Sequence, residues 1–326
     1  MTKAIRIEQF GGPEVMQWID VDVGEPGAGE IRLRHAAAGL NYIEVYQRDG
    51  LYPLTLPSGL GQEGAGVVEA VGGGVTELRP GDRVAYGSGP PGSYSETRLI
   101  PADKVVKLPE AIDDRTAACI MLKGMTAYYL LHLTHAVKPG DVILVHAAAG
   151  GVGSLLVPWA RHLGAEVIGT AGSAEKAGRA RTFGCNHVIE YAREDVAKRV
   201  REITGGRGVD VVYDAVGKAT YEASLDSLRP RGLMVSFGNA SGTIPAVDML
   251  ELMKRGSLFI TRPSLVHHVS TREEMVTAAQ AVFDAVSSGV IDVDIHQTYP
   301  MSDAAQAHRD LEARKTSGCT VLVPPQ

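Results

Sequence analysis

The chain has 326 residues, of which 44% are hydrophobic and 21% charged, so it is long enough for about two globular domains with real cores. A formal net charge of −6 argues against a surface dedicated to nucleic acid, and no run of about 18 apolar residues predicts a membrane span. Cys119, Cys185 and Cys319 are too widely spaced for a disulfide framework or a metal knuckle, so a reduced, cytoplasmic location is expected.

The first part of the chain, up to about residue 120, has the pattern of an antiparallel β domain. Short alternating segments predict strands at 30–36, 67–71 and 82–85, with a short helix at 43–49. Glycine and proline separate these segments. A glycine-rich turn is predicted at 61–66, with Gln62 and Glu63 inside it.

After residue 124 strands and helices alternate regularly. Strands are predicted at 141–146, 166–170, 187–190, 209–213 and 233–237, with helices between them. This alternation is typical of βαβ units, so we predict an α/β fold with a doubly wound parallel sheet of the Rossmann type.

The alternation ends near residue 265. A long helix at about 271–287 and a strand at 320–323 remain, which is too little for a third domain. We therefore predict that residues 1–124, completed by 265–326, form one domain and that 125–264 form the nucleotide-binding domain.

The strongest motif is Val145-His-Ala-Ala-Ala-Gly-Gly-Val-Gly-Ser154, which matches the dinucleotide fingerprint G-x-G-x-x-G with alanine in place of the first glycine. The pattern alone is weak. Here a predicted strand ends at His146 and a helix begins near Gly151, which is the context that binding of a pyrophosphate needs. The predicted phosphate-binding residues are Gly150, Gly151, Val152 and Gly153. A tight turn without a ligand is the minor alternative.

The end of the next strand predicts which cofactor is bound. An NAD enzyme usually presents a carboxylate there to the ribose hydroxyls. This chain has Gly172 and Ser173, followed by Lys176, and a small pocket with a cation favours the 2′-phosphate of NADPH. Glu175 is expected to point to solvent. Lys176 as an ordinary solvated helix residue is the alternative.

The order of these parts resembles the medium-chain dehydrogenases and reductases. The resemblance covers essentially the whole chain, and the segments that carry it are 61–66, 80–84, 92–96 and 147–153. In that family a GroES-like β-rich catalytic domain precedes the Rossmann domain and receives the chain again at its end. The resemblance implies that architecture here.

Zinc-dependent members of the family carry their metal ligands at positions that this chain fills differently. Asn41 stands in place of a cysteine, Gln62 in place of a histidine, and Leu122 falls near the third ligand. Zn²⁺ prefers thiolate, imidazole or carboxylate, so no metal is expected. The pairs His132/His135 and His267/His268 each lack a third ligand.

Within the family the chain is most similar to the zinc-free, zeta-crystallin-like NADPH:quinone oxidoreductases. The segments that carry this likeness are 39–46, 50–53, 122–128, 236–239 and 261–264. It implies NADPH-dependent reduction of quinones. Because a quinone is a good hydride acceptor with a delocalised product anion, hydrogen bonds can replace the metal.

Asn41, Tyr46 and Tyr52 are the predicted catalytic residues. Asn41 offers an amide to the nicotinamide ribose or to the quinone oxygen, and the tyrosines can stack on a planar ring and donate an O–H. Packing is the competing role for either tyrosine. Lys123 is either a proton relay or a structural cation. By resemblance, further cofactor contacts come from Tyr46, Thr126, Tyr191, Val216, Gly217, Phe237, Gly238, Asn239 and Ala240.

The segment 257–261 is predicted to be the last strand of the Rossmann sheet. Exposed edges are normally covered or paired, and in the family this edge pairs with its twin, so a homodimer is expected. Two other functions remain open. One is reduction of α,β-unsaturated carbonyls with NADPH. The other is an NADPH-binding protein with an RNA-binding or structural role, against which the acidic balance counts.

Overall fold

The computed structural model describes residues 2–325 and divides into two compact units. Unit 1 runs to Met125 and takes in Val269–Ser288 and the chain from Val293 onward. Unit 2 consists of Thr126–His268 and Gly289–Asp292. The chain therefore passes from unit 1 into unit 2 and then returns.

Unit 1 is built on β-sheets. A seven-stranded sheet has the order β15-β16-β3-β5-β6-β8, with β7 also pairing with β3, and a three-stranded sheet has the order β2-β1-β4. Their strands are β1 Thr2–Ile7, β2 Gln17–Val21, β3 Glu30–Gly39, β4 Ser58–Gly59, β5 Glu63–Val71, β6 Arg83–Tyr86, β7 Thr97–Pro101, β8 Val106–Lys107, β15 Ile295–Pro300 and β16 Cys319–Val323.

The helices of unit 1 lie around these sheets. They are α1 Tyr42–Arg48, α2 Asp114–Tyr128, α9 Arg272–Ser287 and α10 Ala304–Glu312, with short 3₁₀ turns η1 Pro13–Val15, η2 Ala102–Lys104 and η4 Met301–Asp303. The long helix α9 has a capping box made by Thr271 and Glu274. A side chain at Gly124 of α2 would meet Val282 of α9 at 2.7 Å, so the two helices pack closely.

Unit 2 is a doubly wound α/β domain, which confirms the predicted fold class. Its six strands are parallel in the order β11-β10-β9-β12-β13-β14. They are β9 Val142–Val145, β10 Glu166–Ala171, β11 His187–Glu190, β12 Val209–Asp214, β13 Leu228–Ser236 and β14 Phe259–Thr261. The helices are η3 Tyr129–Thr134, α3 Gly151–His162, α4 Ala174–Thr182, α5 Val196–Ile203, α6 Tyr221–Ser227, α7 Met249–Lys254 and α8 Leu265–His268.

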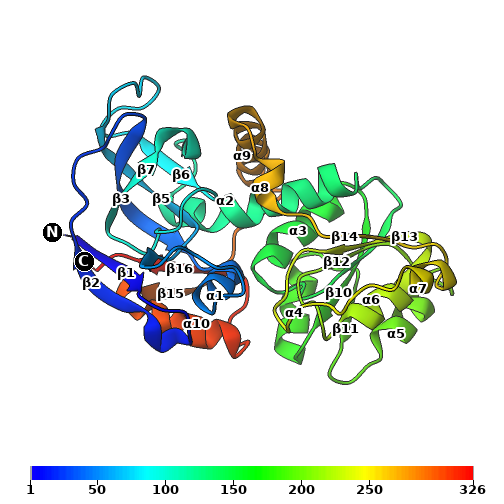
Figure 1. Cartoon of the computed structure of the whole chain (residues 1–326). Helices are drawn as coiled ribbons and strands as arrows, with labels where there is room; N and C mark the ends of the chain where they lie inside the picture. Colours follow the sequence, from blue (N-terminus) through cyan, green and yellow to red (C-terminus); the bar gives the residue numbers. More distant parts are fainter. Residues whose placement is uncertain (1, 326) are drawn as a thin grey trace. The chain divides into compact units, whose positions relative to one another are not determined.

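The helices cover both faces of this sheet (Figure 1). Right-handed crossovers place α3 and α4 on one face and α5, α6 and α7 on the other. The second face buries an apolar cluster that includes Leu144, Val200 and Leu225. Because parallel strands all point the same way, their carboxyl ends form one edge of the sheet, where the loops carry polar and glycine residues.

Two local predictions were wrong. Glu63 belongs to strand β5 rather than to a turn, because it pairs with Gly39 of β3. Strand β13 begins at Leu228, earlier than predicted, since Leu228 pairs with Val209 although the segment that follows is charged. The segment with His132 is helical and forms the π-helix η3, and the N–H of His135 donates to the carbonyl of Leu130, five residues back.

Within the described part of the chain, no helix combines the length and the apolar character that crossing a lipid bilayer requires.

Candidate functional site

The glycine-rich fingerprint forms the turn between β9 and α3. Gly150 is the N-cap of α3, and among the described residues no side chain caps the helix and no acidic residue lies in its first turn. The first N–H groups of this helix of 12 residues therefore have no side-chain cap and carry its positive dipole end. A Cβ at Gly153 would lie 2.5 Å from the carbonyl oxygen of Ala148, so only glycine fits there. The geometry suits a phosphate group.

The residues predicted to recognise the 2′-phosphate lie together at the end of β10. Ser173 is the N-cap of α4, and its Oγ accepts the N–H of Lys176 at 3.3 Å. Gly172 faces the Tyr191 hydroxyl closely enough that a Cβ at position 172 would lie 2.4 Å from it. Glu175 is exposed, as predicted. Lys176, Ser173 and Tyr191 thus lie near Gly172, and none of these residues is a carboxylate that would repel a phosphate.

The loop after β12 is fixed by the carboxylate of Asp214. Its Oδ1 accepts the N–H groups of Val216 at 2.7 Å and Gly217 at 3.0 Å. Its Oδ2 accepts the hydroxyls of Thr220 at 2.7 Å and Ser224 at 2.8 Å. Asp214 is fully buried, and its four hydrogen bonds order the chain around it.

A buried histidine connects that carboxylate to the neighbouring strands. His146 Nε2 lies 3.0 Å from the Ser224 hydroxyl, and its Nδ1 lies 3.1 Å from the Thr170 hydroxyl. Burial lowers the pKa of His146, although the Asp214 carboxylate opposes this. A neutral imidazole therefore joins the ends of β9 and β10 to α6 and holds the fingerprint turn in place.

The loop after β13 lies against the loop after β12. The N–H of Phe237 donates to the carbonyl of Asp214 at 2.8 Å, and the N–H of Ser241 donates to that of Val216 at 2.8 Å. The predicted cofactor residues of both loops are therefore neighbours. In unit 2, the predicted cofactor residues lie in the loops that follow β9, β10, β11, β12 and β13 or in the first turns of α3 and α4, except Thr126, which is buried near the end of α2.

The three positions that hold zinc ligands in related enzymes meet in unit 1, where a hydrogen-bonded ion pair occupies their surroundings. The Lys123 ammonium lies 2.6 Å from Glu63 Oε2, and both side chains are buried. Asn41 Nδ2 donates to the same oxygen at 3.0 Å, and the N–H of Leu122 donates to Glu63 Oε1 at 2.9 Å. A Cβ at Gly39 would lie 2.3 Å from Glu63 Oε2, so the glycine makes room for this carboxylate.

A second buried carboxyl group, that of Glu44, completes the cluster. It accepts the N–H groups of Asn41 at 2.5 Å and Gln62 at 3.1 Å, and it forms a capping box with Asn41 at the start of α1. Burial raises the pKa of Glu44 to about 8, and the Lys123 ammonium and the N–H donors oppose this rise. Burial alone would lower the pKa of Lys123, but the Glu63 carboxylate outweighs it and raises that pKa.

These residues do not fit a zinc ion. Leu122 has no donor atom in its side chain, and the amide of Asn41 already bonds to two carboxyl groups. Lys123 places a positive charge beside Glu63. Among the described residues no group of three or more His, Cys, Asp and Glu side chains is arranged to hold a metal. Lys123 is thus buried and paired with Glu63, which favours the role of a structural cation over that of a proton relay.

The predicted catalytic tyrosines lie beside this cluster, on and after α1. The ring of Tyr46 packs edge-on against that of Tyr52, with centroids 5.2 Å apart, and tilted against that of Tyr42 at 5.3 Å. The N–H of Tyr52 donates to the carbonyl of Tyr46 at 2.8 Å. Tyr46 is nearly buried, at 7% exposure, whereas Tyr52 is partly exposed. Tyr52 is the better placed of the two to meet a substrate.

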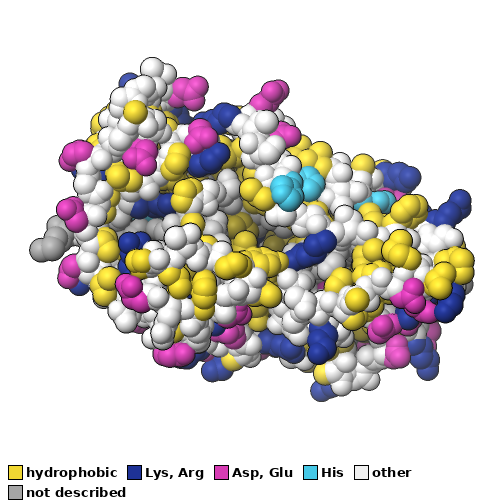
Figure 2. All heavy atoms as spheres, in the orientation of Figure 1, with side chains coloured by type: hydrophobic (Ala, Val, Ile, Leu, Met, Phe, Trp, Pro, Cys, Tyr) yellow, Lys and Arg dark blue, Asp and Glu magenta, His cyan; other side chains and the backbone are white. Residues whose placement is uncertain are grey.

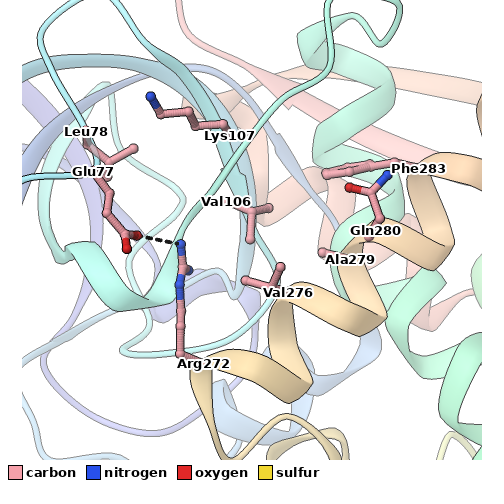
Figure 3. Close-up of a pocket in the computed structure, with 9 residues that line it drawn as sticks. All are labelled: Glu77, Leu78, Val106, Lys107, Arg272, Val276, Ala279, Gln280 and Phe283. Carbon is pink, nitrogen blue, oxygen red and sulfur yellow. Dashed lines mark ion pairs between the residues drawn. The ribbon is translucent and has the colours of Figure 1, made fainter.

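A pocket of about 300 Å³ in unit 1 contains none of these residues. In Figure 3, Val276, Ala279 and Phe283 of α9 face Val106 across it, and Arg272 points to Glu77 at one end. Arg272 also donates to the carbonyls of Asp103 and Val105, and Lys107 pairs with Asp82. Both cations that line the pocket are therefore already paired within unit 1.

Reasoning from the sequence missed Glu44, Glu63, Asp214 and His146 as parts of the site. One signal was visible, because Asn41 and Glu44 have the spacing of a capping box. The others come from different strands and helices, and only folding brings them together. The paired histidines take separate roles: His135 pairs with Asp141, and His268 stacks on Tyr129 with centroids 4.3 Å apart.

Comparisons with known proteins agree with this architecture. Residues 27–110 match the alcohol dehydrogenase GroES-like domain, and residues 151–289 match the zinc-binding dehydrogenase family. The chain is 50% identical to a quinone oxidoreductase of Pseudomonas aeruginosa, over 99% of this chain and 100% of the other. It is also 50% identical to a 2-haloacrylate reductase of a Burkholderia species, over 99% of both chains.

A solved structure shows the same likeness. It is a quinone oxidoreductase of Escherichia coli complexed with NADPH, which is 48% identical to this chain and superposes with a TM-score of 0.97. The likeness covers 99% of this chain and 100% of that one.

Proposed function

The chain belongs to the family of medium-chain dehydrogenases and reductases, and from that premise we propose that it reduces quinones with NADPH, without a catalytic metal ion. The observation that carries the proposal is the buried cluster around Asn41. The positions of the metal ligands hold Asn41, Gln62 and Leu122, and an ion pair between Lys123 and Glu63 lies among them. A substrate that needs no Lewis acid is therefore favoured.

The residues of unit 2 hold the cofactor in this proposal. NADPH supplies a hydride at the nicotinamide ring when it is bound. The N–H groups at the start of α3, from Gly151 to Gly153, bind the pyrophosphate. Ser173, Lys176 and Tyr191 bind the 2′-phosphate, and Lys176 contributes the positive charge that favours it. Asp214 fixes the loop with Val216 and Gly217, so that the nicotinamide half meets an ordered surface.

The residues of unit 1 face the substrate in this proposal. Tyr52 donates its O–H to the quinone oxygen on which negative charge develops, and its ring lies along the flat substrate. Tyr46 supports the ring of Tyr52. Asn41 and Thr126 meet the nicotinamide half. The chain thus replaces a Lewis acid by hydrogen bonds aimed at a delocalised anion.

The similarity to a 2-haloacrylate reductase supports a second candidate, the reduction of α,β-unsaturated carbonyls. A haloacrylate is a carboxylate and would need a cation beside it. Two cations at or next to α1 are already paired, Lys123 with Glu63 at 2.6 Å and Arg48 with Glu312 at 2.9 Å. This favours a neutral acceptor such as a quinone.

A panel of quinones, neutral enones and 2-haloacrylates tests the proposal. Each acceptor is offered with NADPH and then with NADH, and loss of the nicotinamide absorbance is followed. We expect the highest kcat/KM with a quinone and NADPH. Turnover of a haloacrylate alone would instead select the second candidate. Absence of any turnover, together with RNA binding that NADPH displaces in a filter assay, would favour a binding role.

We also propose that the enzyme is a homodimer. Strand β14 pairs with β13 on one side and with no other strand of the described chain. Hydrophobic side chains gather over the end of unit 2 that carries α7 (Figure 2), and Met249, Met253 and Phe259 are each more than half exposed. A sedimentation experiment should give twice the mass of 34.6 kDa. A monomer at micromolar concentration would refute this.

A cytoplasmic location is a further proposal, which rests on cysteine usage. All three cysteines are buried free thiols. Such thiols persist in a reducing compartment. Fractionation of cells that produce the protein, probed with an antibody, tests the location, and recovery from a secreted fraction would contradict it.

A further inference from the structure

The amide of Asn41 is held in one orientation. Its Nδ2 donates to Glu63 Oε2 at 3.0 Å and lies 3.3 Å from Glu44 Oε1, with the Gly39 carbonyl at 3.4 Å. All three of these atoms face Asn41 as acceptors. Glu63 Oε2 also accepts from Lys123, and Glu44 Oε1 also accepts the N–H of Gln62, although the raised pKa of Glu44 leaves that group a proton at neutral pH. Turning the amide over would place Oδ1 against two carboxyl groups and remove a buried hydrogen bond to Glu63. The nitrogen therefore faces inward.

Glu63 is the group that enforces this orientation. It is fully buried at the start of β5, and two donors of α2, the Lys123 ammonium and the Leu122 N–H, hold its carboxylate at 2.6 and 2.9 Å. Lys123 donates to Oε2 and Leu122 to Oε1, so both oxygens of Glu63 act as acceptors. Asn41 thus faces an oxygen that is held in place by Lys123 and that can accept from the amide nitrogen of Asn41 but cannot donate to its amide oxygen.

Only the side-chain carbonyl of Asn41 remains available to a ligand. Both N–H bonds are directed at the carboxyl groups, which leaves the carbonyl oxygen Oδ1. This oxygen has two lone pairs, and the capping box with Glu44 uses one of them. Asn41 can therefore accept one further hydrogen bond but has no N–H left to donate.

We propose that Glu63 is a positioning residue that restricts Asn41 to accepting a hydrogen bond, so that Asn41 binds a hydroxyl of the nicotinamide ribose and not the quinone oxygen. A ribose hydroxyl can donate, whereas a quinone oxygen that gains negative charge needs a donor. The inference rests on the proposed function and separates the two roles open to Asn41. Donation to the quinone then falls to Tyr52.

The substitution Asn41→Asp tests this through a pH profile. The new carboxyl group would face Glu44 from α1, Glu63 from β5 and Lys123 from α2, with the Tyr94 hydroxyl beyond Glu44. When protonated, its O–H replaces the inward N–H and its other oxygen still accepts. When ionised, it is repelled by Glu63. We expect near-normal affinity for NADP⁺ at pH 5.5, falling about tenfold by pH 8.

Calorimetric titration with NADP⁺, which is stable in acid, measures this without turnover. The double variant Asn41→Asp/Glu63→Gln moves the negative charge across the same hydrogen bond and keeps the net charge. The glutamine then accepts the Leu122 N–H with its oxygen and donates from its nitrogen to the aspartate, which also becomes the partner of the Lys123 ammonium, so the affinity should return to within about twofold of the wild type at pH 8. Glu63→Gln alone frees the amide of Asn41 to turn over and should bind about tenfold more weakly.

Other outcomes would overturn the proposal. If Asn41→Asp binds NADP⁺ normally at every pH while kcat for quinone falls, the amide N–H donates to the substrate. If the double variant binds no better than Asn41→Asp, Glu63 does not set the orientation. Far-UV circular dichroism confirms folding of each variant, and the double variant decides the question should Asn41→Asp not fold. A wild-type protein that binds NADP⁺ but reduces no quinone would overturn only the proposed function.

Discussion

Loss of the buried ammonium in Lys123→Met should destabilise unit 1. Lys123 and Glu63 have side chains that are 4% and 0% exposed, and their nitrogen and oxygen atoms lie 2.6 Å apart. Removing one partner of a buried ion pair typically costs about 3–5 kcal/mol, because the other charge is left uncompensated. Methionine fills a similar volume, so the lost charge and not a cavity determines the result.

The surroundings of Glu63 place the expected value within that range. Two N–H donors, those of Leu122 and Asn41, remain on the carboxylate after the substitution, at 2.9 and 3.0 Å. They stabilise the remaining charge in part, so we expect a loss of about 3 kcal/mol in the free energy of unfolding. The double variant Glu63→Gln/Lys123→Met removes both charges and should regain about half of that loss.

The chain offers a direct optical readout. It has two tryptophans, Trp18 on β2 in unit 1 and Trp159 on α3 in unit 2. In a Trp159→Phe background, fluorescence during urea denaturation reports unit 1 alone. Matching curves for the parent, the single and the double variant then give the coupling between the two charges.

Two results would refute the reasoning. A loss below about 1 kcal/mol in Lys123→Met would show that the charge of Glu63 is compensated by other means. A double variant that is less stable than Lys123→Met would show that Glu63 stabilises the fold independently of its partner. Either result would also weaken the case that Lys123 holds the Glu63 carboxylate in place for Asn41.

Three further predictions concern cofactor, catalysis and pH. Lys176→Ala should lower kcat/KM for NADPH about 10- to 100-fold and leave that for NADH unchanged, because a charge-assisted hydrogen bond is lost; equal losses with both cofactors would contradict this. Tyr52→Phe should lower kcat about 100-fold with little change in the KM for NADPH, with Tyr42→Phe as the control, and an unchanged kcat would remove Tyr52 from the mechanism. Burial lowers the pKa of His308 from 6.5 to about 3, and the Arg48 guanidinium adds to this. Below pH 6.5 this histidine is protonated in the unfolded chain but not in the folded one. Between pH 7 and pH 5 the wild type should therefore lose about 2 kcal/mol of unfolding free energy relative to His308→Asn. Urea titrations in which the difference between the two proteins stays the same at both pH values would contradict this.

The pH dependence of the wild type itself combines opposing groups. Glu44, with its pKa raised to about 8, carries a proton in the folded state at pH values where the unfolded chain has lost it. Its contribution to stability is complete below pH 4.5 and is lost as the pH rises toward 8, the reverse of the trend for His308. The effect of His308 is therefore measured as the difference in unfolding free energy between the wild type and His308→Asn at each pH, in which the contribution of Glu44 cancels.

The sequence determined what local patterns encode. The alternation of strands and helices after residue 124 predicts a doubly wound sheet, because the period of apolar residues depends only on local backbone geometry. The turn that ends at Gly153 and the small residues Gly172 and Ser173 could also be identified, because each is a short contiguous motif. The absence of zinc ligands at 41, 62 and 122 was also readable, once the order of the parts had indicated the family.

Only the tertiary structure decided which polar groups meet. Glu63 read as a residue of a turn, yet pairing with β3 draws it into a strand, where it faces Lys123 from a helix 60 residues further along the chain. Asp214 and His146 are joined through Ser224. Such contacts depend on which elements pack together, and hydrogen bonds that span distant segments leave no periodic trace in the sequence. The sequence therefore identified Asn41 as the residue that stands in place of a metal ligand. The fold determined that its amide nitrogen is bonded to Glu63 and Glu44.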